Sequence, residues 1–98
     1  MGLGEVEMRY VRVKWEHDFE DDPVVYLSEL GEDGYELRKV QIYRDGRTEW
    51  ADETRETETV GLSEIAFPSN EEISSSPGFC ARDISREEFE RFWREAKS

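Results

Sequence analysis

The sequence predicts an α+β protein, in which an antiparallel β-sheet of about four to five strands carries a C-terminal amphipathic helix on one face and a short helix near residues 70–76. Short alternating segments separated by turn residues are typical of antiparallel strands. The residues after 84 instead show the 3.6-residue apolar period of a surface helix. The chain is 98 residues long, so we expect a flexible leader over 1–7 and one domain over 8–98, with either Met1 or Met8 as the start.

The first predicted strand runs from residue 8 to residue 15, where side chains alternate in type. One face carries Val11, Val13 and Trp15. The other face carries Tyr10, Arg12 and Lys14. Residues 16–23 are too acidic and unpatterned for a strand, and Pro23 favours a loop. Residues 24–30 are predicted as a second strand, with a helical turn as the alternative, and a turn follows at 31–34.

A hairpin is predicted from residues 35–43 and 47–51. A two-residue Asp-Gly turn would pair apolar residues with polar ones across the two strands. A three-residue loop with Gly46 in the left-handed conformation instead pairs Val40 with Trp50. Because the buried face sets the register, we expect the three-residue loop.

The apolar positions early in residues 35–43 are out of phase with the later ones, which predicts a β-bulge near Arg38 and Lys39. Residues 52–59 are almost wholly polar and predict a loop, and 60–67 are expected to run extended along the sheet. Ser69 and the glutamate three positions on form a capping box that starts the short helix.

The C-terminal helix has the clearest signals in the chain. Ser85 is the expected N-cap, with Glu88 completing a capping box and Ile84 forming a hydrophobic staple with Phe89. Its apolar stripe consists of Phe89, Phe92, Trp93 and Ala96. We expect this stripe to pack on the sheet face that bears Val11, Val13, Val40, Ile42 and Trp50.

The chain is strongly acidic, with 25 Asp and Glu against 13 Lys and Arg and a net charge of −12. Residues 16–37 contain nine acids and no Lys or Arg. Such a field attracts basic proteins and repels nucleic acid, so we expect a basic protein as partner. No apolar run is long enough to cross a membrane, and we expect no membrane partner.

Cys80 is the only cysteine, which excludes an internal disulfide and favours a cytoplasmic location. Cysteine is among the residue types most often buried, so we expect Cys80 in the core or on a strand. A catalytic thiol would need a partner base. His17 is the only histidine that could supply one.

Two further groups of residues are candidate sites. His17 with Asp18, Asp21 and Asp22 could gather a divalent cation or act as a general base. Their spacing matches no metal-binding signature, so we expect no metal and no cofactor. The second group, basic and aromatic residues on one predicted sheet face, is of the kind that binds single-stranded nucleic acid, but the net charge opposes it: Tyr10, Arg12, Lys14, Lys39, Gln41, Tyr43 and Arg47.

The opening MRYxxVxWxHDxxDDP over residues 8–23, the later YExRKV and YRDGR segments and the ending ISxEEFxxxW form one set of motifs. In these motifs the chain resembles an uncharacterised family of short acidic bacterial proteins, catalogued as a domain of unknown function. The resemblance spans nearly everything from Met8 onward. It implies a bacterial cytosolic protein and carries no catalytic residue with it.

Together these features predict a non-catalytic protein-interaction domain. Its sharper form is an acidic inhibitor or immunity-type protein that occludes a basic enzyme. The expected anchors are Trp15, Phe19 and Tyr26, beside the acids of residues 16–22. The alternative is a small metal-dependent or acid–base enzyme centred on His17. We expect a monomer or a weak homodimer.

Overall fold

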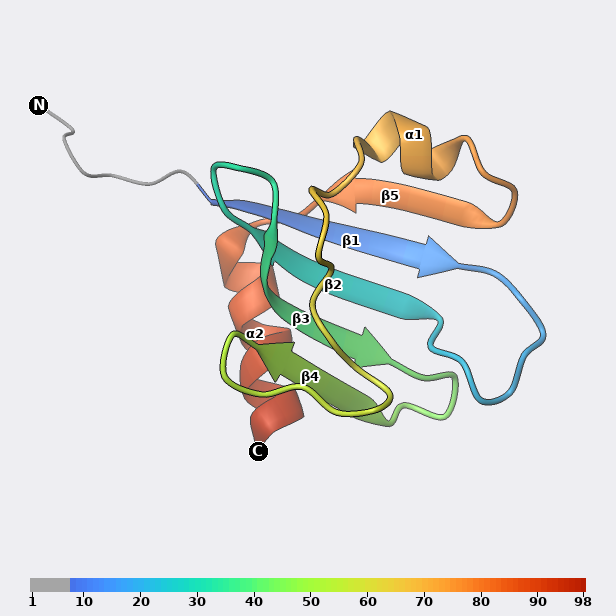
Figure 1. The fold of residues 1–98 in the computed structure, drawn as a ribbon. Coiled ribbons are helices and arrows are strands. Elements are labelled where there is room, and N and C mark those ends of the chain that lie inside the picture. The colour runs from blue at the N-terminus through green and yellow to red at the C-terminus, as the bar shows by residue number, and fades with distance from the viewer. Residues whose placement is uncertain (1–7) are drawn as a thin grey trace, which may run out of the picture.

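Five antiparallel strands form one sheet in the order β4-β3-β2-β1-β5 in the computed structural model, which describes residues 8–98 (Figure 1). The expected leader, residues 1–7, lies outside the described part of the chain. The elements in chain order are β1 (Arg9–Trp15), β2 (Val25–Leu30), β3 (Glu36–Ile42), β4 (Thr48–Asp52), α1 (Asn70–Ser74), β5 (Phe79–Asp83) and α2 (Arg86–Lys97). The predicted α+β class is confirmed.

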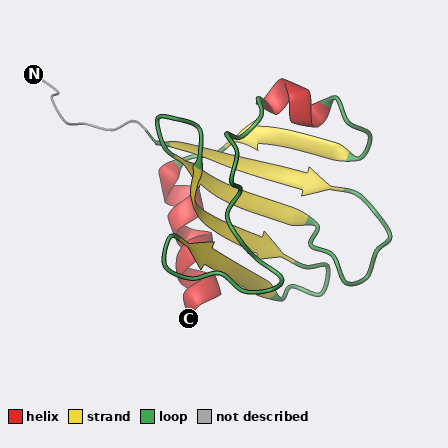
Figure 2. Ribbon diagram, in the orientation of Figure 1, coloured by secondary structure: helices red, strands yellow, loops and turns green. Residues whose placement is uncertain are grey.

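The two faces of the sheet are covered differently. Helix α2 packs across one face, which we call the helix face (Figure 2). The long connection from β4 to α1, residues 53–69, crosses the opposite face, where α1 lies along β5 (Figure 1). We call this connection the strap and the surface beneath it the strap face. Between residues 8 and 98, no helix combines the length and the apolar character needed to cross a bilayer.

The predicted hairpin register is confirmed. Val40 lies opposite Trp50 across β3 and β4. Gly46 has φ +92°, the left-handed conformation that the three-residue loop requires. The predicted bulge exists but lies at Leu37, one residue before the expected place, since Glu29 pairs with Arg38 and the next residue of β2 pairs with Glu36.

Both predicted helix caps are present. The Ser85 Oγ accepts a hydrogen bond from the Glu88 amide at 3.0 Å, and the Ser69 Oγ accepts one from the Glu72 amide at 3.1 Å. These bonds satisfy amides that have no partner inside the helix. Ile84, at the staple position, packs against the core beneath α2. Each helix therefore begins where its local sequence directs.

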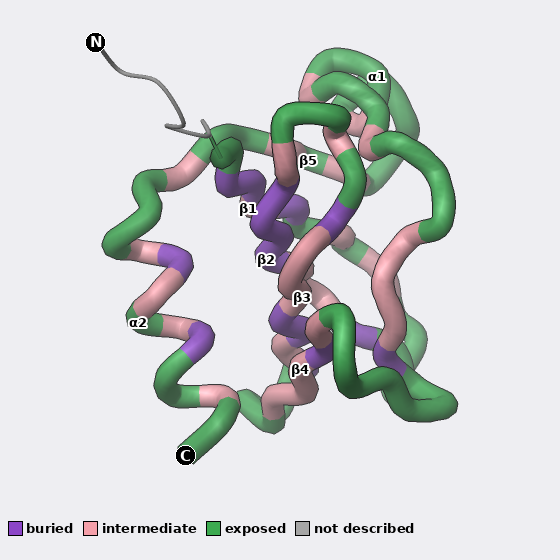
Figure 3. Tube along the Cα trace, turned by 60° about the vertical axis from the view of Figure 1, so that its left-hand side comes forward, coloured by how far each residue is buried: buried purple, intermediate pink, exposed green. Residues whose placement is uncertain are grey.

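The buried positions of α2 face the sheet (Figure 3). They belong to the helix-face core, whose buried members are Tyr10, Leu27, Val40, Phe89 and Trp93. Val40, Ile42 and Trp50 contact this core as expected, but the expectation for β1 was wrong. Val11 and Val13 lie on the strap face, where they pack with Leu30. The apolar side of β1 faces the strap, and only Tyr10 from its other side joins the helix-face core. Because both faces of the sheet are covered, the apolar side of a strand does not by itself reveal which face meets α2.

Arg38 joins α2 to the sheet. Its guanidinium donates two hydrogen bonds to the Glu29 carboxylate, at 2.7 and 2.8 Å, and two to the Glu90 carboxylate of α2, at 2.7 and 3.1 Å. The Tyr10 hydroxyl donates to the same Glu29 carboxylate at 2.9 Å. The guanidinium carbon also lies 4.9 Å from the centre of the Phe89 ring. Bidentate, charge-assisted contacts of this kind are the strong class of hydrogen bond.

The strap is held to its face mainly by polar groups. Glu36 is 4% exposed, and its carboxylate accepts hydrogen bonds from the Ser28 hydroxyl and the Ser63 amide, both at 2.6 Å. Lys39 donates to the Gly61 carbonyl at 3.0 Å. Val60 is the buried apolar residue of the strap. The strap therefore depends on a few buried hydrogen bonds rather than on a wide apolar stripe.

Side chains satisfy backbone groups at both free edges of the sheet. The register places the Trp50 carbonyl on the outer side of β4, where Arg55 donates to it at 2.6 Å and stacks on the indole ring at 4.0 Å. On the outer side of β5 the Ala81 amide donates to the Ser74 hydroxyl at 2.9 Å. Each edge strand thus has an outward backbone group occupied by a side chain, and on β4 the Asp52 amide and carbonyl also pair with the backbone of Arg55.

The Arg38 contacts predict a large and pH-dependent cost for Arg38→Met. The substitution leaves the Glu29 carboxylate buried without its cation, so we expect a loss of about 3–5 kcal/mol at neutral pH. Burial raises the pKa of Glu29, but hydrogen bonds from Arg38 and Tyr10 outweigh burial and hold that pKa below its usual value. In the wild type this contribution is complete above the unfolded pKa and is lost as the pH falls through the folded pKa.

Without Arg38 the carboxylate is more easily protonated than in water, so the deficit of Arg38→Met should shrink between neutral pH and about pH 3.5. Urea denaturation of wild type and Arg38→Met at the two pH values measures this deficit in the free energy of unfolding. Arg94→Met, at an exposed position of α2, is the matched control and should stay within about 0.5 kcal/mol of wild type. A deficit that does not change with pH would contradict the assigned role.

Candidate functional site

The loop between β1 and β2 is tied to three neighbouring segments. The Trp15 amide donates to the Val24 carbonyl at 2.9 Å and closes the base of the loop. The Glu16 amide donates to the carbonyl of Gly78, just before β5, at 2.8 Å. Arg44, from the β3–β4 hairpin, donates to the His17 carbonyl. These contacts fix where the loop leaves the sheet.

His17 uses both ring nitrogens inside this loop. Its Nδ1 accepts a hydrogen bond from the Phe19 amide at 2.9 Å. The proton therefore resides on Nε2, which donates to the Pro23 carbonyl at 2.8 Å. A general base or a metal ligand needs a free nitrogen lone pair, and the only lone pair of this imidazole is already engaged. His17 braces the loop, and this arrangement does not favour the enzyme alternative.

The acids near His17 do not converge on a common centre. Asp18, Asp21 and Asp22 are all exposed. Within residues 8–98 no group of three or more His, Cys, Asp or Glu side chains is placed to hold a metal ion. Nor does Asp18, Glu20, Asp21 or Asp22 lie within 4.0 Å of a cationic group in that range. We call residues 16–22 the acidic loop, because its charges face solvent.

A cluster of aromatic rings supports the acidic loop. The ring centres of Trp15 and His17 are 4.0 Å apart, and those of Trp15 and Phe79 are 5.4 Å apart in a stacked arrangement. The Phe19 ring lies 6.0 Å from Trp15 and is 60% exposed. The structure thus brings together three of the predicted residues, and Phe79 joins them. The apolar ring of Phe19 is therefore exposed to solvent within a loop rich in carboxylates.

Tyr26, the remaining predicted residue, lies on the strap face instead of in the loop. Its ring is half-buried, and the Lys39 ammonium lies 5.9 Å from the ring centre. Burial raises the pKa of Tyr26, and the nearby Asp22 carboxylate raises it further. Tyr26 is therefore within electrostatic reach of the acidic loop without being part of it.

Tyr26 also lines an open apolar groove of about 220 Å³ on the strap face. Its apolar walls are Val13, Tyr26, Phe67, Ile73 and Phe79. The sequence analysis did not predict this groove, because Phe67 and Ile73 come from the strap and from α1, and neither element has a long periodic pattern. The apolar side of β1 that faces away from α2 is the signal that could have pointed to it.

The basic and aromatic residues considered for nucleic acid do not form one surface. Tyr10, Arg12 and Lys14 lie on the helix face. Lys39 and Gln41 lie on the strap face, where they donate to strap carbonyls. The predicted shared face was wrong, again because the two sides of β1 were interchanged.

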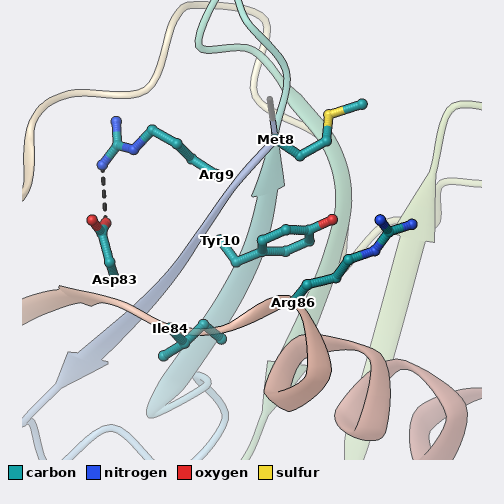
Figure 4. Close-up of a pocket in the computed structure, with 6 residues that line it drawn as sticks. All are labelled: Met8, Arg9, Tyr10, Asp83, Ile84 and Arg86. Atoms are coloured by element: carbon teal, nitrogen blue, oxygen red, sulfur yellow. Dashed lines mark hydrogen bonds and ion pairs between the residues drawn. The ribbon is translucent and has the colours of Figure 1, made fainter. Parts of the chain in front are cut away.

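Cys80 lies on β5 as expected but is exposed rather than buried. Its side of the sheet is not covered by the apolar stripe of α2, and α2 reaches β5 through the ion pair between Glu88 and Arg82 at 3.7 Å. A separate hollow lies at the start of β1, where Arg9 and Asp83 point toward each other and pair at 3.1 Å (Figure 4). The Asn70 amide also donates to Asp83 at 2.9 Å. The Asp83 carboxylate is therefore bound by Arg9 and by Asn70, and these contacts stabilise the fold.

A family model described as a domain of unknown function, DUF6881, matches residues 9–98. No curated protein and no solved structure matches the chain. The family thus covers every strand and both helices, and it brings no activity with it.

Gly78 makes a testable contribution to the position of the acidic loop. It has φ +85°, and a Cβ added there would lie 2.9 Å from the Glu16 carbonyl oxygen. Gly78→Ala should cost about 1–3 kcal/mol in urea denaturation, since strain and a backbone clash add. Gly46→Ala is the control: φ is +92°, but nothing lies within 4 Å of the added Cβ. Equal costs at the two glycines would contradict the close approach.

His17→Ala tests the bracing role. The Phe19 amide loses its acceptor, so we expect its hydrogen exchange to accelerate about tenfold or more, which corresponds to a loss of about 1.4 kcal/mol of local protection. Amides of β2 and β3 should keep their protection. Zinc or magnesium titration of the wild type should leave its melting temperature unchanged, because a ligand of the native state would raise it. An increase that disappears in His17→Ala would restore the metal alternative.

Proposed function

The chain belongs to the DUF6881 family, whose function is unknown, and from its surface we propose that it is a non-catalytic protein-interaction domain that binds a basic protein through the acidic loop. One observation carries the proposal: the Phe19 ring, 60% exposed, is held by Trp15 and His17 within the acidic loop, where Glu16 alone has a cationic partner among residues 8–98. An aromatic ring that the fold leaves exposed beside carboxylates offers a partner both an apolar anchor and a charged rim.

The two kinds of group in the loop have different effects on binding. Carboxylates at solvent-exposed positions act over several ångströms and raise the association rate with a cationic surface. A buried aromatic anchor mainly slows dissociation, because most differences in affinity lie in the off-rate. The loop is braced before binding, so little conformational freedom is lost on association. Both groups therefore contribute to one interface.

The narrower form of the proposal is an inhibitor or immunity-type protein that covers the basic surface of an enzyme. The net charge of −12 and the small size suit this role. The resemblance to short acidic bacterial proteins supports a bacterial cytoplasm as its setting, and so does the presence of a single free cysteine. The engaged nitrogens of His17 are the reason that an enzyme is not proposed.

A pull-down from the native host with matched variants tests the proposal. The first variant neutralises the loop with Asp18→Asn, Glu20→Gln, Asp21→Asn and Asp22→Asn. The control removes the same charge from exposed acids elsewhere with Glu32→Gln, Glu53→Gln, Glu58→Gln and Glu64→Gln. We expect wild type and control to capture one basic protein in stoichiometric amount at low salt. The neutralised variant should not capture it.

Kinetics with that partner then separate the two contributions. Neutralisation should slow association about tenfold at low salt, and Phe19→Ala should speed dissociation about tenfold or more. The control should stay within about twofold of wild type in both rates, as surface substitutions away from an interface do. Equal capture and equal salt dependence for all four proteins would refute the proposal, and so would the absence of any captured protein.

A further inference from the structure

The acidic loop and the apolar groove form one continuous surface. The Phe79 ring stacks on Trp15 at 5.4 Å and also lines the groove. The Phe19 ring lies 6.0 Å from Trp15 on the loop side. Tyr26 also lines the groove, and the Asp22 carboxylate of the acidic loop raises the pKa of its hydroxyl. Because both rings lie near Trp15, the Phe79 and Phe19 rings are no more than about 11 Å apart, a distance that about four residues of an extended peptide span at about 3.3 Å per residue.

The groove has the size and chemistry of a pocket for one side chain. An apolar cavity of about 150 Å³ holds a benzene ring, and this groove measures about 220 Å³. Its two charged groups, Lys39 and Glu36, lie 3.3 Å apart and neutralise each other. The remaining lining is mainly apolar, so an entering apolar side chain meets no unpaired charge.

We propose that this groove receives one apolar side chain of a basic partner segment, whose flanking lysine or arginine residues pair with the acidic loop. The inference rests on the proposed function and specifies its partner: a short segment with one aliphatic or aromatic residue among cations. Charge complementarity selects this occupant over a second copy of the chain. A second copy would bring another net charge of −12 to the same surface, and like charges oppose association.

The test is selection of peptides from a displayed random library on the immobilised full-length protein. We expect enriched peptides to share one Leu, Ile, Phe or Trp position within a few residues of two or more Lys or Arg. Replacing that apolar residue by Ser in a synthetic peptide should weaken binding about tenfold or more, equivalent to about 1.4 kcal/mol. Replacing the cations by Glu should abolish binding.

Variants of the protein then locate the bound side chain. Pro68→Trp fills the groove from an exposed position at its rim, and Ile73→Ala removes part of its wall. Both should weaken the selected peptide about tenfold or more while thermal melting shows a folded protein. The matched control is Ile65→Gln, since Ile65 is 70% exposed and does not line the groove. It should bind like wild type.

The outcomes separate the groove from the proposed function. Peptides that need the acidic loop but bind both groove variants like wild type would overturn the groove and leave the loop function standing. Selected peptides without any enrichment of Lys or Arg would overturn both the groove inference and the proposed function of the acidic loop. Self-association in analytical ultracentrifugation that Pro68→Trp abolishes would assign the groove to a second copy and likewise overturn the proposed occupant.

Discussion

Arg38 is the contact on which the arrangement of both layers depends. A single guanidinium on β3 holds a carboxylate of the neighbouring strand and a carboxylate of α2, beneath the Phe89 and Trp93 rings. Hydrophobic burial is non-directional and would let an amphipathic helix slide or rotate on an apolar sheet. The forked geometry of Arg38 fixes the helix at one point along the sheet.

The two faces of the sheet are closed by opposite means, and the candidate surface follows from the difference. Under α2 the closure is apolar, with interlocking rings and aliphatic side chains. Under the strap it relies on hydrogen bonds with strap backbone groups: Glu36 accepts one from an amide, and Lys39 and Gln41 donate to carbonyls. A segment attached through its backbone need not fill the space above the sheet with side chains. The apolar residues of β1 and β2 on that face therefore stay partly open, and the groove is what remains.

Local sequence predicted the elements well, because caps, turns and periodicity act over a few residues. Ser85, Ser69 and Gly46 each have the role that their sequence context indicates. The relation between distant strands was harder. Strand β1 has one apolar side, but both faces of the sheet are covered, so nothing in residues 9–15 decides whether Tyr10 or Val11 meets the helix.

For the candidate site, the acidic loop and its aromatic residues were predicted from composition and order along the chain. The two hydrogen bonds of His17 were not, because its acceptor and donor are backbone groups that every residue carries. The sequence likewise grouped Glu29 with the acids of residues 16–37. In the structure it is 8% exposed and is a buried partner of Arg38. The hairpin register could be predicted because a short turn joins β3 and β4, whereas the hydrogen bonds of His17 and the Arg38 pair depend on how the elements pack in three dimensions.

The occupied sheet edges have a consequence for how this protein behaves at high concentration. A bare edge strand offers a row of free amides and carbonyls on which another chain can continue the sheet, the first step of fibrillar assembly. Arg55 occupies the Trp50 carbonyl on β4 and Ser74 occupies the Ala81 amide on β5, so a strand that paired along the whole of either edge would have to displace a side chain. The chain can thus carry an exposed aromatic ring and an open groove while side chains on both sheet edges hinder the addition of strands from other chains.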